Sequence, residues 1–360
     1  MDSQTAAREA GLRYVDDRQA GITRRRRGRH FAYFHSDGAL VRDRREIERI
    51  KALAIPPAYS HVWISPIPNG HIQATGRDAR GRKQYRYHKR WREVRDEAKY
   101  HRLVAFGRAL PAIRTVVAKD LSGTELSRRK VLAAIVTIMD STGVRVGNEE
   151  YARDNGSFGI TTLRSRHVRV DGSMVRLRFR GKTGRDYSIA LDDRRLARIV
   201  KRCRDLPGEE LFSYLDQAGT VSTLTSDDVN EYLREIAGET FSAKDFRTWI
   251  GTVECIASLT EPASGQTEVK QKIAEALAGV AARLGNTPAI CRKAYVHPAV
   301  LETYTRAGRL PAHNGKPVAA RPRGGGLSRD ERFALRFVER WERRAPLEKT
   351  RERSPRTARS

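Results

Sequence analysis

The sequence predicts an α+β fold, with a small β-rich N-terminal domain and a larger, mostly α domain that contains a three-stranded antiparallel sheet. The first quarter of the chain holds short alternating, β-branched runs that are broken by Asp-Gly and Asn-Gly. Helical apolar spacing follows, and after Gly156 the hydrophobic period changes to two. We therefore expect three regions: the N-terminal domain of residues 1–90, the second domain of residues 91–315, and a basic linker, helix and tail of residues 316–360.

The N-terminal domain is expected to consist of short strands with one helix between them. Residues 31–41 and 61–78 alternate in hydrophobicity and contain turn dipeptides, which is typical of antiparallel strands. Residues 45–55 show helical apolar spacing and stop at Pro56, which a helix does not readily pass. These patterns predict a small twisted sheet.

The second domain begins with helices and then changes to strands. Residues 131–139 form a strongly apolar helical stretch, and a second helix is expected to begin near Arg145. Three period-two segments follow, with turns at Asp171-Gly172 and at Gly181 to Gly184. They predict an antiparallel sheet made of residues 157–170, 173–182 and 184–192.

The rest of the chain is expected to be mostly helical from Asp192 to about residue 310. Residues 311–328 are rich in Gly and Pro and are typical of a linker. A last basic helix is predicted for residues 329–345, followed by a polar tail.

The charge balance points to a polyanionic partner. The 360 residues include 70 Lys and Arg against 43 Asp and Glu, which gives a formal net charge of +27 spread along the chain. So basic a chain repels itself unless it binds a polyanion, and nucleic acid gains affinity by releasing counterions. An anionic membrane is the weaker alternative, because no apolar stretch is long enough to span a bilayer.

Several chemistries are disfavoured by the sequence. Cys203, Cys255 and Cys291 lack metal-binding spacing and are odd in number, so we expect neither disulfides nor a metal site. No P-loop, two-metal carboxylate cluster or Gly-x-Ser-x-Gly motif occurs. The N-terminus lacks a signal-peptide core, so we expect a protein of the reducing cytoplasm that associates with the nucleoid.

The remaining chemistry-bearing residues are scattered cations and tyrosines, which suit phosphoryl transfer without a metal. Reversible cleavage of a phosphodiester needs a nucleophile, cations that balance charge on the phosphate oxygens, and an acid for the leaving oxygen. If the nucleophile is a side chain, a covalent intermediate conserves the bond energy, so resealing needs no ATP.

Five segments of the sequence resemble poxvirus-like and bacterial type IB DNA topoisomerases, in the same order and with similar spacing. The resemblance covers about residues 10–310, and residues 316–360 carry no matching motif. The segments are GRDARGRKQYRYH, TGVRVGNEEYARDNGSFGITTLRSRHV, FRGKTG, KDFRTW and LGNTPAICRKAY, which span residues 76–88, 142–168, 179–184, 244–249 and 284–295.

The resemblance implies the site residues. Tyr295 falls on the family's nucleophile, Arg145 and Arg247 on its two catalytic arginines, and Lys182 on its catalytic lysine. Asn286 occupies a position where the poxvirus enzymes carry histidine. Asparagine can donate a hydrogen bond to a phosphate oxygen but cannot transfer a proton.

The chemistry of each residue gives a second argument that is independent of the resemblance. A phenol such as Tyr295 is a weak nucleophile until nearby cations stabilise its phenolate. We expect Arg145 at a helix N-terminus, where the helix adds to anion binding, and Arg247 near the start of another helix. The alternatives are ordinary surface ion pairs, for Arg247 with Asp245 or Glu254. Lys182 stands at a predicted hairpin tip, from which it could protonate the leaving oxygen.

The residues expected to contact DNA lie mainly in the N-terminal domain. Gln can read adenine edges, and basic neighbours can hold phosphates. The basic run from Arg24 to Arg27 is either a solvated arm or a further DNA contact. The predicted DNA-binding set is Lys83, Gln84, Tyr85, Tyr87 and Lys244.

The resemblance implies a monomeric enzyme that closes around duplex DNA and relaxes supercoils. It would cleave one strand through a 3′-phosphotyrosyl intermediate, allow swivelling and religate, with no cofactor. One alternative is a tyrosine site-specific recombinase, although those enzymes usually show His-x-x-Arg where this chain has Lys244-x-x-Arg247. The other is a non-catalytic basic DNA-binding protein, which the charge alone would equally support.

Overall fold

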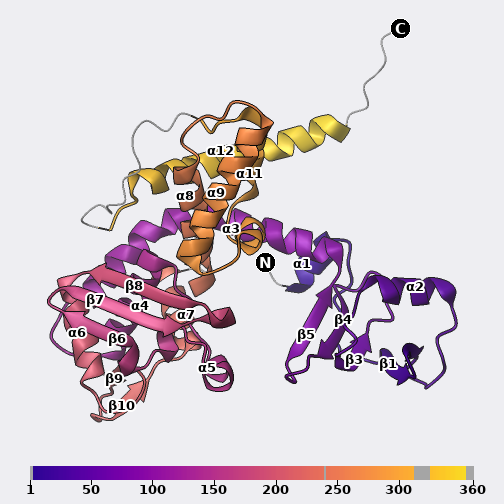
Figure 1. Ribbon diagram of the computed structural model, residues 1–360, viewed down its shortest axis with the longest axis horizontal. Helices are drawn as coiled ribbons and strands as arrows, with labels where there is room; N and C mark the ends of the chain where they lie inside the picture. The colour runs from indigo at the N-terminus through magenta and orange to yellow at the C-terminus, as the bar shows by residue number, and fades with distance from the viewer. Residues whose placement is uncertain (1–2, 239–240, 312–324, 354–360) are drawn as a thin grey trace, which may run out of the picture. The chain divides into compact units, whose positions relative to one another are not determined.

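The computed structural model describes residues 3–238, 241–311 and 325–353. These form two compact units, Met1–Tyr100 and His101–Ser360, which are drawn in Figure 1. The first unit contains an antiparallel sheet, and the second is mostly helical around a three-stranded antiparallel sheet. The predicted α+β fold class is confirmed.

The first unit is built on a five-stranded sheet with the strand order β2-β1-β3-β4-β5. Its core includes Ile22, Ile50 and Ile64, each at most 1% exposed. The predicted helix is present as α2, and Asp43 caps its first turn by accepting a hydrogen bond from the Arg45 amide. The elements of this unit are α1 (Ser3–Glu9), β1 (Ile22–Arg27), β2 (His30–Phe34), α2 (Arg44–Ala52), β3 (Ser60–Ile64), β4 (Ile72–Arg77) and β5 (Lys83–Tyr87).

The basic run of the N-terminal region forms a strand, so of its two alternatives the solvated arm does not hold and the DNA contact stays a prediction. Residues 22–27 form β1 and pair along their length with β2. The guanidinium of Arg24 donates to the carbonyl oxygens of Pro56 and Tyr59, at 3.0 and 2.7 Å. Arg25 lies over the Phe34 ring, 4.7 Å from its centroid. Backbone pairing and side-chain contacts therefore hold this run in the sheet.

The second unit contains most of the helices. The long helix α3 (Lys89–Asp120) leads into it, and in the described part of the chain seven longer helices and two short ones follow, with five strands between them. The helices are α4 (Arg128–Thr142), α5 (Glu149–Asn155), α6 (Arg194–Arg204), α7 (Ser226–Ala237), α8 (Ala243–Ser258), α9 (Gln266–Leu284), α10 (Pro288–Ala294), α11 (Pro298–Ala307) and α12 (Arg329–Arg353). The strands are β6 (Val168–Asp171), β7 (Met174–Arg180), β8 (Asp186–Asp192), β9 (Ser213–Leu215) and β10 (Val221–Thr223), and short 3₁₀ turns η1, η2 and η3 span Ile160–Thr162, Ser165–His167 and Lys182–Gly184.

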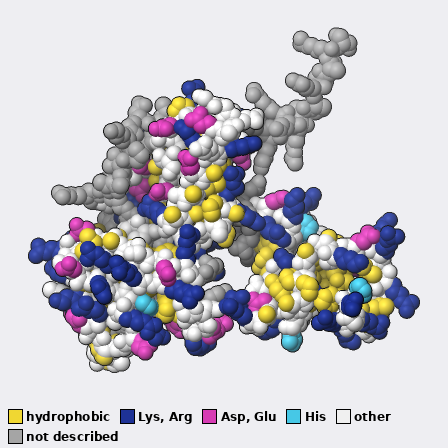
Figure 2. Space-filling model, viewed as in Figure 1, with side chains coloured by type: hydrophobic (Ala, Val, Ile, Leu, Met, Phe, Trp, Pro, Cys, Tyr) yellow, Lys and Arg dark blue, Asp and Glu magenta, His cyan; other side chains and the backbone are white. Residues whose placement is uncertain are grey.

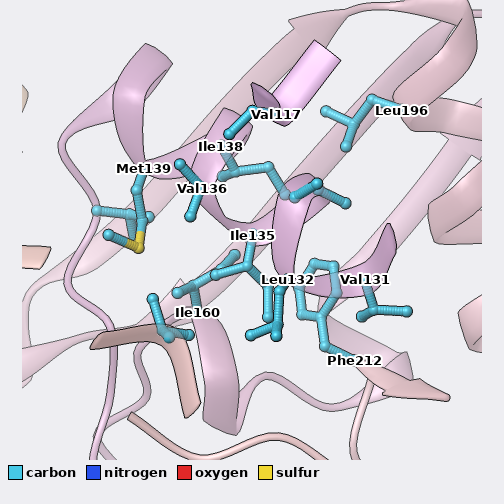
Figure 3. Packing of buried hydrophobic residues seen from close by; sticks show 14 of the residues in the cluster. Val117, Val131, Leu132, Ile135, Val136, Ile138, Met139, Ile160, Leu196 and Phe212 are labelled. Carbon is cyan, nitrogen blue, oxygen red and sulfur yellow. The ribbon is translucent and has the colours of Figure 1, made fainter. Parts of the chain in front are cut away.

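Helix α4 lies at the centre of the larger core. Figure 3 shows its apolar side chains packed among residues of neighbouring elements, including Ile160, Leu196 and Phe212. A helix that is apolar on every side is stable only when it is surrounded. Ser127 begins α4 with a side-chain cap, and Gly143, in the left-handed region at φ +69°, ends it.

The three-stranded sheet has the order β6-β7-β8. Along β7, Val175, Leu177 and Phe179 are buried and alternate with exposed arginines, as the period-two pattern predicted. The register of β7 with β8 ends at the pair Arg180 and Asp186. The turn between these strands is η3, which carries Lys182.

Three local predictions for this unit were wrong. Arg145 lies in an irregular segment, residues 143–148, and not at a helix start, because its backbone pairs with residues 160 and 161 instead. Of the predicted strand 157–170, only the end forms β6, and two 3₁₀ turns occupy the middle. The hairpin of β9 and β10 was missed, because its strands have only three residues each.

The C-terminal helix α12 begins at Arg329, as predicted, and extends to Arg353. Its residues Ala334, Phe337 and Val338 join a second core formed with α8, α9, α10 and α11. Most of the predicted linker and the end of the tail, residues 312–324 and 354–360, lie outside the described residues. Within the described ranges, no helix combines the length and hydrophobicity needed to cross a bilayer.

Candidate active site

Residues from five separate segments of the second unit line one cavity of about 260 Å³. They include Arg145, Lys182, Lys244, Arg247 and Tyr295, which the sequence selected as catalytic or DNA-binding residues. The other lining residues are Val146, Gly147, Asn148, Ser157, Phe158, Gly159 and Ala243. The lining of this cavity therefore has four cations and a phenol but no carboxylate.

Tyr295 follows the last residue of α10 and is held against α8 through its backbone. Its amide donates to the carbonyl oxygen of Cys291 at 3.0 Å, and its own carbonyl accepts from the Thr252 hydroxyl at 3.4 Å. Gly251 makes this approach possible, because a methyl group at that position would lie 2.7 Å from the Tyr295 carbonyl oxygen. Thr252 also accepts from the His297 amide at 3.1 Å, which fixes the turn after the tyrosine.

Arg247 lies beside the phenol ring, within the first turns of α8. Its side chain is buried, with the residue 3% exposed, and its guanidinium carbon lies 4.8 Å from the Tyr295 ring centroid. It donates to the carbonyl oxygens of Gly143 and Leu284, the latter at 2.8 Å. Its Nε has no hydrogen-bond partner among the described residues. One buried donor is therefore available for an anion.

The alternative reading of Arg247 as half of an ion pair does not hold. Asp245 pairs instead with Arg102 at 3.3 Å and accepts hydrogen bonds from Ser242 at the start of α8. Glu254 pairs with Arg283. Burial lowers the pKa of Arg247, and the repulsion from Arg145 acts in the same direction. A phosphate bound in the cavity would stabilise the charged guanidinium against both effects.

The cations in the cavity favour the phenolate form of Tyr295. Burial opposes ionisation of the phenol, but the charge and hydrogen bond of Arg247, together with the charges of Arg145 and Lys244, outweigh burial. The pKa of Tyr295 is therefore lower than that of an ordinary tyrosine. A lowered pKa is what activates a weak nucleophile near neutral pH.

Arg145 is oriented by three groups that lie far from it in the chain. Its guanidinium donates to the Tyr187 hydroxyl at 2.8 Å and to Oδ1 of Asn286 at 2.5 Å. A longer contact of 3.4 Å reaches the carbonyl oxygen of Gly285. The segment that carries Arg145 is itself fixed by the Ile160 amide, which donates to the Arg145 carbonyl oxygen at 2.8 Å.

Tyr187 on β8 is a site residue that the sequence did not single out. Its hydroxyl accepts from Arg145 and donates to the carbonyl oxygen of Leu284 at 3.1 Å. Its ring stacks on Phe179, with centroids 5.0 Å apart. Only a glycine fits at positions 181 and 285, where a methyl group would lie 2.4 Å from the Tyr187 ring and 1.9 Å from its hydroxyl. Gly181 beside Lys182 thus has a packing role within the fold.

Asn286 lies at the end of α9, and its side chain turns toward the cavity residues. The backbone amide donates to the Ala281 carbonyl oxygen at 3.0 Å, which helps close the helix. Thr287, and not Asn286, caps the following helix α10. The side-chain Nδ2 is buried without a hydrogen-bond partner among the described residues. This second unused donor lies next to Arg145, which holds the amide oxygen.

Lys182 and Lys244 are exposed at the edge of the cavity. Lys182 is the first residue of η3, and Lys244 is the second residue of α8. Their ammonium groups can approach a bound phosphodiester from two different elements. Among the residues that the structure describes, no cluster of three or more His, Cys, Asp or Glu side chains could hold a metal ion.

The other predicted DNA-contacting residues lie on β5 of the first unit. Lys83 pairs with Asp17 at 2.5 Å, and Gln84 donates to Asp78 at 3.0 Å. Tyr85 and Tyr87 stack with ring centroids 5.7 Å apart, and Tyr85 is 43% exposed. The polar side chains of this strand thus have intramolecular partners, while an aromatic surface is open to solvent.

Comparisons with known proteins agree on one family. A family model described as the eukaryotic DNA topoisomerase I catalytic core matches residues 88–311, and one described as the bacterial DNA topoisomerase IB N-terminal domain matches residues 30–78. The chain is 32% identical over 293 residues to DNA topoisomerase 1B of Acanthamoeba polyphaga mimivirus, covering 79% of this chain and 87% of the relative. It is 22% identical over 301 residues to DNA topoisomerase 1B of vaccinia virus (strain Copenhagen), covering 75% and 89%. The chain therefore belongs to the type IB DNA topoisomerase family and is an enzyme of that class.

Proposed function

We propose that the enzyme relaxes supercoiled duplex DNA by transient cleavage of one strand, with Tyr295 as the nucleophile. The observation that carries the proposal is the cavity that brings one activated phenol together with two guanidinium and two ammonium groups. A phosphodiester placed there has a nucleophile on one side and positive charge around its non-bridging oxygens.

The cleavage step transfers one phosphate from DNA to protein. The Tyr295 phenol loses its proton to solvent, and its oxygen attacks phosphorus as the bond to the 5′ oxygen breaks. The products are a 3′-phosphotyrosyl link and a 5′ oxygen, which takes a proton from Lys182 to become a hydroxyl. Religation is the reverse of this step, so no nucleotide or metal ion is needed to restore the strand.

The remaining donors stabilise the pentacoordinate phosphate. Arg247 offers its unused Nε and Asn286 its unused Nδ2, while Arg145 donates to Oδ1 of the same Asn286. Arginine suits this role because its planar fork matches two phosphate oxygens. Lys244 adds positive charge at the start of α8, where the helix dipole also favours an anion.

The supercoil relaxes while the strand is open. One copy of the chain binds duplex DNA, with residues 91–315 as the catalytic domain and residues 1–90 contributing the β5 contacts. In this proposal Lys83, Gln84, Tyr85 and Tyr87 exchange their intramolecular partners for DNA. Torsion in the DNA then drives rotation about the uncut strand before the hydroxyl attacks back.

The proposal is tested by plasmid relaxation in EDTA without ATP, together with a denaturing gel for the protein–DNA adduct. We expect wild-type protein to relax the plasmid and form the adduct, and Tyr295→Phe to do neither while still binding DNA. An adduct formed by Tyr295→Phe would contradict the assignment of the nucleophile. A tetramer bridging two sites would indicate a recombinase, and binding without any adduct a non-catalytic protein.

A further inference from the structure

Glu331, at the beginning of α12, is the centre of a buried polar network. Its carboxylate accepts two hydrogen bonds from Arg114 on α3, at 2.6 and 3.0 Å. It also accepts from the indole nitrogen of Trp249 on α8 at 3.2 Å and from the Ser328 amide at 2.7 Å. Glu331 is 7% exposed and Trp249 is 1% exposed. Four hydrogen bonds, from α3, from α8 and from the residue before α12, thus converge on one carboxylate.

Arg114 extends the network to α4. Its Nε and Nη2 donate to the two carboxylate oxygens of Asp140, at 2.9 and 3.1 Å. Nη1 also donates to the carbonyl oxygen of Gly326 at 3.0 Å. Together with the bonds to Glu331, all five guanidinium donors have acceptors. Such a saturated buried cation fixes the relative positions of the elements that supply those acceptors.

Both routes from Glu331 end at a catalytic arginine. Trp249 lies two residues after Arg247 on α8, and two residues turn a helix by about 200°, so the two side chains point to opposite sides. Asp140 lies five residues before Arg145, near the end of α4. The carbonyl oxygen of Gly143, at that same helix end, accepts from Arg247. The network therefore contacts α8 on the side opposite Arg247 and contacts α4 near its C-terminal end.

Helix α12 lies outside the part of the chain that the catalytic-core family model matches, which ends at residue 311. Figure 1 shows α12 running past α8, and the contacts of Ala334, Phe337 and Val338 dock it in the second core. A buried ion pair is costly to desolvate, and apolar residues of similar size often stabilise a fold as well, but removal of one partner alone is strongly destabilising. Unlike apolar packing, the pair also constrains the direction in which the helix docks.

We propose that Glu331 is a positioning residue, which fixes α8 and α4 and through them Arg247 and Arg145. This inference rests on the proposed role of Tyr295. A shift of α8 would change the distance between the Arg247 guanidinium and the phenol, and so the stabilisation of the phenolate. Loss of the network should therefore alter how cleavage depends on pH, which a simple loss of stability would not do.

The groups around Tyr295 define what such a pH profile can report. The cations that face it come from α8, from the segment after α4 and from η3, and the remaining titratable groups lie on or beside α10. Glu331 itself stays ionised throughout the relevant range, because Arg114 holds its pKa at about 2 despite its burial. The charged groups that line the cavity with Tyr295 are Lys244, Arg247, Arg145 and Lys182, and the titratable residues on or beside α10 are Cys291, Arg292, Lys293 and His297.

The test compares Glu331→Gln with Glu339→Gln in the full chain. Both residues lie on α12 and pair with an arginine of α3, since Glu339 bonds Arg108 at 2.8 Å. Only Glu331 touches α8 and, through Arg114, α4. The substrate is a nicked duplex whose cleaved end fragment dissociates, so that religation is prevented. Its single-turnover cleavage is measured from about pH 6 to about pH 10, around the range where a phenol titrates. The temperature is kept below each variant's unfolding transition.

We expect Glu331→Gln to slow cleavage about 10-fold at neutral pH and to move the profile to higher pH by about half to one unit. Glu339→Gln should match the wild type in both respects. The inference would be overturned if the cleavage rate of Glu331→Gln had the wild-type dependence on pH. A lower amplitude of cleavage with an unshifted pH dependence would overturn it as well.

Trp249→Phe provides a second variant if Glu331→Gln does not fold. It keeps an aromatic ring in place but removes the indole donor to Glu331, so a shift in the same direction and of smaller size is expected. An unshifted profile in a folded Trp249→Phe enzyme would also count against the inference. Formation of the protein–DNA adduct by Tyr295→Phe would instead refute the proposed function. Failure of the positioning role of Glu331 and failure of the proposed function therefore give different results.

Discussion

At the scale of single residues, Tyr187 joins three parts of the catalytic unit. Its hydroxyl connects Arg145 to the carbonyl oxygen of Leu284 at the end of α9. Its ring fills space that Gly181 and Gly285 leave open. A side chain that orients a cation of the candidate site needs to be rigid, and stacking on Phe179 together with these close contacts provides that rigidity.

Tyr187→Phe is expected to slow cleavage about 10-fold, because Arg145 loses the acceptor that orients it. It should also reduce the free energy of unfolding by about 1 kcal/mol through the lost hydrogen bond. Single-turnover cleavage and urea unfolding measure the two effects. The matched control is Tyr304→Phe, since the Tyr304 hydroxyl donates to the Glu261 carbonyl oxygen at 2.7 Å and Tyr304 does not line the cavity. If both variants slow cleavage equally, Tyr187 has no particular role in the site.

At the scale of elements, helix α8 places candidate site residues in the cavity and other side chains in the core. Lys244 and Arg247 line the cavity, while Phe246 and Trp249 pack edge-on against Phe106 of α3 in the core. Gly251, one turn after Arg247, receives the backbone of Tyr295. The helix thus sets the spacing between Tyr295, the proposed nucleophile, and the arginine beside it.

Gly251→Ala is expected to slow cleavage about 10–100-fold, because the added methyl group displaces Tyr295 from Arg247. Gly279→Ala, in α9, is the matched control, since nothing lies within 4 Å of the added group. It should raise the free energy of unfolding by about 0.5–1 kcal/mol through better helix propensity and leave cleavage unchanged. Wild-type cleavage by Gly251→Ala would show that the close approach of these backbones is not needed.

The contribution of Glu331 on α12 to the free energy of unfolding should decrease in acid. The folded pKa of Glu331, about 2, lies below its ordinary value, so its contribution to stability is complete above that ordinary value of 4.5. The contribution is lost as the pH falls through the range between them, and it amounts to on the order of 3 kcal/mol. Urea unfolding at several pH values measures this loss. Glu331→Gln should be less stable near neutral pH and show a flatter acid dependence, and an equally steep dependence would assign the effect to other carboxylates.

At the scale of the whole molecule, positive charge is spread over both units. Figure 2 shows Lys and Arg side chains across the visible surface of each, with acidic side chains among them. Many arginines are paired locally, as Arg129 is with Asp120 and Glu235. The surplus of 27 positive charges remains after such pairing. Exposed pairs add little stability, so the surplus serves mainly to attract DNA.

The affinity for duplex DNA should therefore fall steeply with salt. Between about 50 and about 200 mM salt we expect a loss of about 1,000-fold or more, because the release of condensed counterions from DNA gains less free energy at higher salt. Fluorescence anisotropy with a labelled duplex measures it, and Tyr295→Phe should give the same slope because it changes no charge. A nearly flat salt dependence would mean that the basic surface does not contact phosphates.

Much of this organisation was predictable from local patterns. The apolar stretch of α4 and the alternation along β7 fixed those elements, because their burial follows from hydrophobic period alone. The short strands β9 and β10 were missed, since three residues are too few to show a period. The segment around Arg145 was misassigned, because Gly143 and Gly147 end the helical pattern and its backbone bonds to a distant segment.

The sequence by itself determined which residues could do the chemistry, because residue type, order and spacing are properties of the chain. It could not determine that Tyr187 would hold Arg145, or that Arg114 would meet Glu331 across 217 positions. Such contacts depend on how whole elements pack, and no local pattern encodes the packing. The tertiary structure alone decided which groups surround the phenol of Tyr295 and which buried residues hold them in place.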